Sequence, residues 1–124
     1  MRTNGVSEEE EIEEIVRIIN DESRAGASVV VEGETDRDAL LGRGVTAHVL
    51  TLRELILGAK RGGLEGERIL VLLDLDSEGE ALLRRLRSLL PPTAKLDTAL
   101  RERIRGTQRY RHGRRTIQQI FMAP

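Results

Sequence analysis

The stretch that decides the fold reads ILVLLDLDSEGE and occupies residues 69–80. Its first five residues form an uninterrupted apolar run of strand length, which is typical of a strand covered on both faces of a parallel sheet. The run stops at Asp74. A helix is predicted to follow through about Leu90, because prolines at 91 and 92 end it.

A second unit of the same kind lies upstream, in SVVVEGETD at residues 28–36. Its β-branched run predicts another covered strand, which ends at Glu32 and Gly33. Thr35 is placed to cap a short helix through Leu41, since acidic residues follow it in the first helical turn. In both units, an apolar strand leads into an acidic turn and a helix.

The remaining chain continues this alternation. Its predicted elements are a capped helix from Ser7 to about Ala25, a strand from Val45 to Leu50, a helix capped by Thr51 through about Lys60, and an edge strand at 93–97. The alternation predicts a Rossmann-like α/β fold with about four parallel strands and helices on both faces. We expect an acidic N-terminal helix at 1–26, a core at 27–97 and a basic extension at 98–124.

Composition excludes several kinds of site. A length of 124 residues fits one domain, and the absence of cysteine rules out disulfides, thiolate zinc sites and cysteine nucleophiles. Tyr110 and Phe121 are the only aromatic rings, so stacked aromatic platforms for nucleic-acid bases are not expected. No signal peptide or membrane span is predicted, so we expect a cytoplasmic protein that does not bind membranes.

The formal net charge of −1 conceals two oppositely charged ends. Residues 1–22 carry a net charge of −6, and residues 95–124 carry +6. The basic residues between 101 and 115 are Arg101, Arg103, Arg105, Arg109, Arg111, His112, Arg114 and Arg115. Guanidinium groups bind phosphate through paired hydrogen bonds, which makes this segment a candidate contact for a nucleic-acid backbone. The alternatives are a solvated tail, or one that docks on the acidic first helix of a second subunit in a homodimer.

Acidic residues end both covered strands. In an open parallel sheet, ligands bind beyond the carboxyl ends of the strands. If the two strands are neighbours, Glu32, Asp74 and Asp76 converge there with no cationic residue beside them in the sequence. A divalent cation would neutralise such a cluster, and oxygen ligands favour Mg²⁺, or Mn²⁺, over zinc. Glu78, at the start of the following helix, is a candidate third ligand.

A purely structural role is the alternative for these acids, because aspartate is common at helix starts. Asp76 or Ser77 is predicted to cap the helix that follows. Ser77 and Glu80 have the spacing of a capping box, and we assign those two residues mainly that role. Taken together, Glu32, Asp74 and Asp76 favour a metal site.

The motifs VVEGETD at residues 30–36 and DLDSEGE at residues 74–80 resemble the two signatures of the Toprim domain. The resemblance covers about residues 27–97. Toprim domains occur in type IA and type II topoisomerases, bacterial-type primases, overcoming-lysogeny-defect nucleases, recombination mediators and the ribonuclease that matures 5S ribosomal RNA.

The resemblance implies a role for each matching residue. Glu32 would be a general acid/base or a metal ligand, and Asp74 and Asp76 would bind magnesium. Glu78 matches the third acid of the topoisomerase version of the second motif. The turn glycines that would let the backbone approach a phosphate are Gly33 and Gly79.

The resemblance and the charge pattern together lead to one functional expectation. The chain has no room for the additional domains of topoisomerases or primases, and it resembles the free-standing small Toprim proteins of archaea and bacteria. We expect metal-dependent phosphodiester chemistry on RNA or DNA, as a small nuclease or RNA-processing enzyme. The expected phosphate contacts are Gly33, Gly79, Arg109, Arg111, Arg114 and Arg115.

Two other functions are weighed against this one. The first is a non-catalytic module that binds magnesium and nucleic acid within an RNA-processing or DNA-repair assembly. The second is a small-molecule phosphotransferase or phosphatase, which is less favoured because the turn at residues 62–66 lacks the ending of a phosphate-binding P-loop.

Overall fold

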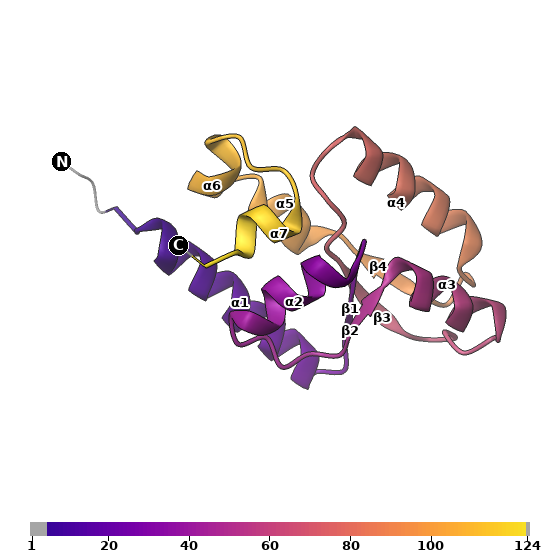
Figure 1. Cartoon of the computed structure of the whole chain (residues 1–124). Coiled ribbons are helices and arrows are strands. Elements are labelled where there is room, and N and C mark those ends of the chain that lie inside the picture. Colours follow the sequence, from indigo (N-terminus) through magenta and orange to yellow (C-terminus); the bar gives the residue numbers. More distant parts are fainter. Residues whose placement is uncertain (1–4, 124) are drawn as a thin grey trace.

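The computed structural model describes residues 5–123 and shows a parallel α/β fold. Four strands form one sheet in the order β2-β1-β3-β4, and every neighbouring pair is parallel (Figure 1). The strands are β1 (Ser28–Val31), β2 (Val49–Thr51), β3 (Arg68–Val71) and β4 (Lys95–Asp97). The predicted fold class is confirmed, and the two apolar strands β1 and β3 are central neighbours. Residues 1–4 and 124, at the outer ends of the predicted terminal segments, lie outside the described residues.

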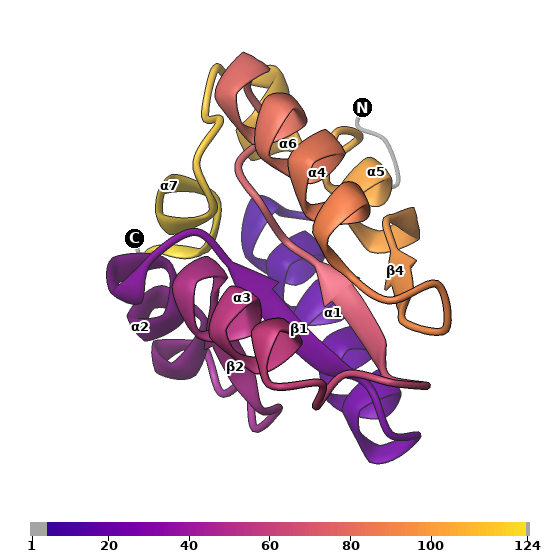
Figure 2. The ribbon, with the colours of Figure 1, turned by 90° about the vertical axis from the view of Figure 1, so that its right-hand side faces the viewer.

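Helices cover both faces of the sheet. They are α1 (Glu8–Arg24), α2 (Glu34–Gly42), α3 (Leu52–Lys60), α4 (Ser77–Leu89), α5 (Ala99–Ile104), α6 (Gln108–Arg111) and α7 (Ile117–Phe121). In Figure 2, α3 and α4 lie in front of the strands and α1 lies behind them. Successive side chains of a strand point to opposite faces, so Val29 and Val31 join the cluster under α1, whereas Val30 joins the one under α3 and α4.

Side-chain caps account for where several helices begin. Ser7 and Thr51 each exchange hydrogen bonds with a glutamate three residues later, and these capping boxes start α1 and α3 as predicted. Helix α4 is capped by Asp76, whose carboxylate accepts a hydrogen bond of 2.7 Å from the amide of Gly79. Of the two predicted caps for α4, the structure selects Asp76, and Ser77 is the first residue of the helix.

Several predicted strand boundaries are wrong: β1 ends at Val31, β3 runs from Arg68 to Val71, and β4 begins at Lys95. Two further differences have a visible cause. Helix α2 begins at Glu34 rather than after Thr35, because Asp36 accepts a hydrogen bond from the amide of Gly33 and so closes the turn one residue earlier. Strand β2 begins at Val49, not Val45. The loop before it is held by Asn20 of α1, whose side chain bonds to the carbonyl of Gly44 and the amide of Thr46, so those groups do not join a strand.

The basic C-terminal segment is folded onto the rest of the domain. Ile104, Ile117, Ile120 and Phe121 are fully buried in the cluster that contains the inner face of α1. Helix α6 packs against α1, and α7 lies beside α2 (Figure 1). The acidic helix therefore has its basic counterpart within the same chain.

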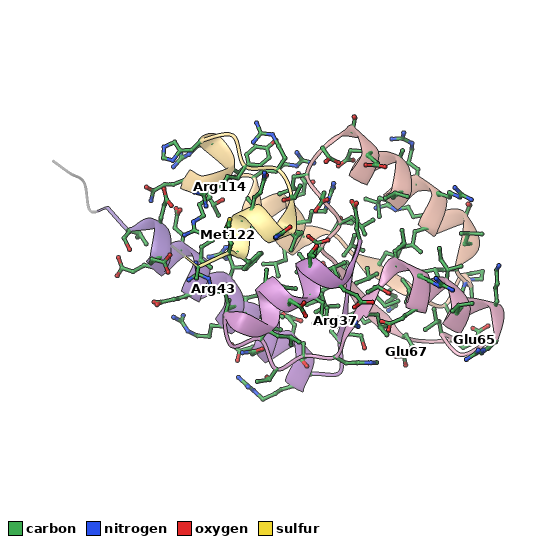
Figure 3. All side chains as sticks on the ribbon, in the orientation of Figure 1. Arg37, Arg43, Glu65, Glu67, Arg114 and Met122 are labelled. Atoms are coloured by element: carbon green, nitrogen blue, oxygen red, sulfur yellow. The ribbon has the colours of Figure 1, made fainter. Side chains whose placement is uncertain are left out.

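Two arginines fix the end of this segment. Arg109 pairs with Glu8 and Glu9 and donates to the carbonyls of Ile120 and Met122. Arg43, after α2, pairs with Glu9 and also donates to the carbonyls of Phe121 and Met122. Figure 3 shows Arg43 and Met122 close together. Within residues 5–123, no helix has the length and apolar character needed to cross a membrane.

Candidate acidic site at the carboxyl edge of the sheet

The two central strands bring Glu32 and Asp74 into direct contact. Glu32 follows β1 at once, and Asp74 follows the covered apolar run that begins in β3. Strand pairing continues to this point, since the amide of Leu72 donates to the carbonyl of Val30 at 2.9 Å. The amide of Asp74 then donates to Oε2 of Glu32 at 3.0 Å. The structure thus joins two of the predicted site residues, which are distant in the sequence.

Each of the three predicted acids accepts a main-chain hydrogen bond through one of its two carboxylate oxygens. Oε2 of Glu32 accepts from the amide of Asp74, Oδ1 of Asp74 accepts from the amide of Ile117 at 2.8 Å, and Oδ1 of Asp76 accepts from Gly79. The second oxygen of each carboxylate receives no hydrogen bond from any described residue. The main chain therefore fixes the orientation of all three groups and leaves one oxygen of each available to a ligand.

Asp36 is a fourth acid at this edge, and its position was not predicted. Its side chain is 6% exposed, and both of its oxygens are occupied, by the amides of Gly33 at 3.2 Å and Gln118 at 3.1 Å. Asp36 is therefore suited to supplying negative charge rather than a ligand atom. Its place in the first motif is the signal that could have identified it, since an acid in a first helical turn is otherwise common.

Burial and the charges of neighbouring acids raise the pKa values of Glu32 and Asp74. Burial raises the pKa of Glu32 to about 7, the hydrogen bond from Asp74 opposes that rise, and the charges of Asp74, Asp76 and Asp36 add to it. Burial likewise raises the pKa of Asp74, against the hydrogen bond from Ile117. The charges of Asp36 and Asp76 add to the rise in the pKa of Asp74. Among residues 5–123, no arginine, lysine or histidine forms an ion pair with any of the four.

A buried arginine supports the loop that carries Asp74. Arg101 is 1% exposed and donates from Nε to the carbonyl of Leu73 at 2.9 Å and from Nη2 to that of Asp74 at 2.5 Å. It also pairs with Glu80 of α4 at 2.5 Å. This role of Arg101 was not predicted, because a buried arginine on a short helix has no distinguishing local pattern.

Only one of the two motif glycines is required by close packing. A Cβ atom at Gly79 would lie 1.9 Å from the carbonyl oxygen of Asp74 and 3.3 Å from Nη2 of Arg101. The first turn of α4 can approach the acidic loop only because residue 79 has no side chain. A Cβ atom at Gly33 would meet nothing within 4 Å.

The remaining predicted site residues lie in different environments. Glu78 is exposed in the first turn of α4 and hydrogen-bonds to no described side chain. Arg109 is 3% exposed, so its prediction as a phosphate contact is wrong: its guanidinium is buried against Glu8, Glu9 and the end of α7. Arg111 is exposed, and Arg114 is partly exposed.

Arg115 contacts the acidic loop through its main chain. Its carbonyl accepts a hydrogen bond of 2.7 Å from the amide of Leu75, between Asp74 and Asp76. Its guanidinium lies 4.0 Å from the centre of the Tyr110 ring. The partly exposed segment 111–115 therefore borders the acidic loop.

The donor set fits a hydrated hard cation better than an enclosed one. In the described part of the chain, no three Asp, Glu, His or Cys side chains form a complete metal-binding group. Mg²⁺ commonly uses one or two carboxylates and keeps several waters, which a substrate phosphate replaces in part. Glu32 and Asp74, with Asp76 two residues further on, offer carboxylate oxygens of that kind and no nitrogen or sulfur donor.

Comparisons with known proteins identify a solved structure with the same fold and a relative that matches part of the chain. No family model matches the chain. A UPF0292 protein from Pyrococcus furiosus is 34% identical over 77 residues, which are 61% of this chain. The match spans only 59% of that relative's length. A solved structure of a protein from Aquifex aeolicus matches 86% of this chain and 94% of its own, with a TM-score of 0.67 and 24% identity, and so shows the same fold.

Proposed function

We propose that this chain is a Toprim-type domain that performs metal-dependent phosphodiester chemistry on nucleic acid. The observation that carries the proposal is the meeting of Glu32 and Asp74 at the ends of neighbouring parallel strands, with one oxygen of each left available. A partly buried acid beside a buried one, without a cationic partner, is costly unless something neutralises the pair, and such groups cluster at functional sites. The strand order and the two motifs support the Toprim resemblance.

Asp74 and Asp76 would hold Mg²⁺ or Mn²⁺, which would neutralise the scissile phosphate and the departing oxygen. Glu32 would hold or transfer a proton at the oxygen that does not accept from Asp74, or take part in binding the ion. The hydrogen bonds from Asp74, Ile117 and Gly79 keep the carboxylates oriented before substrate arrives. Such preorganisation is the main contribution a protein makes to phosphodiester chemistry.

The nucleic-acid backbone would lie along residues 111–115. Arg111, Arg114 and Arg115 are exposed or partly exposed, and the carbonyl of Arg115 is bonded to the acidic loop. Arginines used in this way bind phosphates of any sequence. Arg109 takes no part, because it is buried.

A non-catalytic module is the second candidate, and one observation favours it. Arg101 and Arg109 of the basic segment are buried and paired within the chain, so they cannot act on a bound substrate. Such a protein would bind a cation and nucleic acid but would not turn substrate over. Binding without cleavage distinguishes it from the nuclease.

The test is cleavage of end-labelled RNA and DNA by the purified chain with Mg²⁺ or Mn²⁺. Asp74→Asn and Asp76→Asn are preferred to alanine variants, because asparagine keeps the oxygen that accepts from Ile117 or Gly79. Asp97→Asn is the matched control, since Asp97 ends β4 at the same edge of the sheet and also accepts from a main-chain amide.

We expect cleavage that depends on the metal, is lost in both site variants and is kept in the control. Cleavage that survives in Asp74→Asn and Asp76→Asn rules out the proposed site. Salt-sensitive binding with no cleavage by the unmodified chain would favour the non-catalytic module.

A further inference from the structure

The last helix of the described chain reaches the acidic site through its main chain. The amide of Ile117, the first residue of α7, donates to Oδ1 of Asp74 at 2.8 Å. The amide of Gln118, the second residue, donates to Oδ1 of Asp36 at 3.1 Å. A third bond joins the amide of Leu75 to the carbonyl of Arg115 at 2.7 Å. We call residues 115–118 the C-terminal latch.

The latch donates hydrogen bonds to carboxylates from two different parts of the fold. Asp74 follows β3, whereas Asp36 belongs to α2. Because the first amides of a helix have no partner inside the helix, both donors are free to bond outside it. Neither amide is needed to keep α7 helical, and each is used to hold a buried carboxylate.

Several contacts hold the latch in place. Thr116 and Gln119 form a capping box, and Oε1 of Gln119 also accepts from the amide of Arg115 at 3.1 Å. Ile117 is fully buried beside Ile120 and Phe121. The far end of α7 is fixed by Arg43 and Arg109 through its carbonyl groups. The donors are therefore aimed by a rigid element, not by a loose tail.

We propose that the C-terminal latch is a positioning device for the acidic site. Its main-chain amides orient Asp74 as a ligand of a divalent cation and hold Asp36 where its charge acts on that cation. This inference rests on the proposed function, because it assumes that the site binds a metal. With Oδ1 of Asp74 tied to Ile117, its second oxygen is left available as a ligand. Asp36, with both oxygens held, adds charge from a fixed position.

Proline at position 117 removes the donor with little other change to the backbone. Proline is favoured at the first position of a helix, and the extended backbone of Thr116, with φ −88° and ψ 152°, suits the residue before a proline. Ile117→Pro also shortens a buried side chain, so its matched control is Ile117→Ala, which truncates the side chain but keeps the amide. The two variants differ chiefly in the hydrogen bond to Asp74.

A second pair of variants leaves the core untouched. Gln119→Ala removes the oxygen that accepts from Arg115 and Thr116, and therefore loosens the latch. Its control is Gln118→Ala, a neighbouring exposed glutamine whose main-chain amide, not its side chain, contacts Asp36.

The experiment measures Mn²⁺ affinity by electron paramagnetic resonance, beside the unfolding midpoint of each variant. We expect Ile117→Pro to bind Mn²⁺ about tenfold more weakly than Ile117→Ala, as is usual when a group that orients a metal ligand is lost. Gln119→Ala should be weaker than Gln118→Ala. A merely structural role would lower the unfolding midpoint and leave the Mn²⁺ affinity of the folded protein unchanged.

The outcomes separate this inference from the proposed function. Equal affinities within both pairs overturn the latch, even if the unmodified chain binds Mn²⁺ and cleaves nucleic acid. Affinity that depends on the latch in a chain that cleaves nothing supports the latch and rejects the phosphodiesterase. If the unmodified chain binds no Mn²⁺, both proposals are rejected.

Discussion

The amide of Asp74 donates a 3.0 Å hydrogen bond to the carboxylate of Glu32, across 42 positions of sequence. This bond ties the loop after β3 to the end of β1, so the acids can meet only when these strands are paired. It also places two carboxylates together in a partly buried setting. Strand pairing thus brings together two carboxylates whose charges repel each other, and the raised pKa of Glu32 reflects its burial and this repulsion.

Glu32→Gln should remove a pH dependence of stability. The pKa of Glu32 rises from 4.5 to about 7 on folding, so between these values the folded chain holds a proton that the unfolded chain has lost. Glu32 therefore contributes its full stabilisation below about pH 4.5, and this stabilisation is lost as the pH rises through about 7. Urea unfolding from pH 5 to pH 8 should show a smaller decline in the glutamine variant. A decline of equal size in both proteins would contradict the assigned pKa, and Glu78→Gln, at an exposed glutamate, serves as the control.

Divalent cations should stabilise the folded chain more at pH 8 than at pH 5. At the higher pH the acids are charged and repel one another, whereas at the lower pH protons compete with the cation. A cation at a hundred times its dissociation constant adds about 2.7 kcal/mol to the free energy of unfolding. Thermal unfolding with Mg²⁺, and again after chelation with EDTA, measures this effect. Asp74→Asn should reduce the shift, and Asp97→Asn should preserve it.

Gly79→Ala should destabilise the fold by about 1–3 kcal/mol, as expected for overpacking. The new methyl group would lie 1.9 Å from the carbonyl oxygen of Asp74, so α4 or the acidic loop must move. This loss outweighs the roughly 1 kcal/mol by which alanine favours a helix over glycine. Gly33→Ala is the comparison, because its Cβ atom would meet nothing within 4 Å. Chemical denaturation that finds the two variants equally stable would refute the close-packing explanation.

Arg109→Ala should lower the stability of the fold, whereas Arg111→Ala should affect only nucleic-acid binding. Removing the buried Arg109 takes one donor from Glu8, from Glu9 and from the carbonyls of Ile120 and Met122, which should cost about 3 kcal/mol of stability even though Arg43 still contacts Glu9 and Met122. Removing the exposed Arg111 should change stability by no more than about 0.5 kcal/mol. In nucleic-acid binding, Arg111→Ala should lower the dependence on salt by about one phosphate contact. Titrations at several salt concentrations measure this, and an unchanged slope for Arg111→Ala would exclude that residue from the interface.

The fold and the meeting of the acids could be predicted because their signals are local. Uninterrupted apolar runs identify covered strands, and the acids that end them must share an edge once the strands are neighbours. The donors to these acids could not be predicted, because the amides of Ile117 and Gln118 carry no side-chain signature. Nor does the sequence distinguish Arg109 from Arg111, since the difference between them depends on which face of a four-residue helix packs against α1.

The latch also has a consequence for how the chain acquires its site over time. The bond from Ile117 spans 43 positions and the bond from Gln118 spans 82, and both donors lie after all four acids in the sequence. A nascent chain that has emerged only as far as residue 114 contains all four acids but not the amides that orient Asp74 and Asp36. Asp74 and Asp36 can therefore take this orientation during synthesis only after residue 118 has left the ribosome.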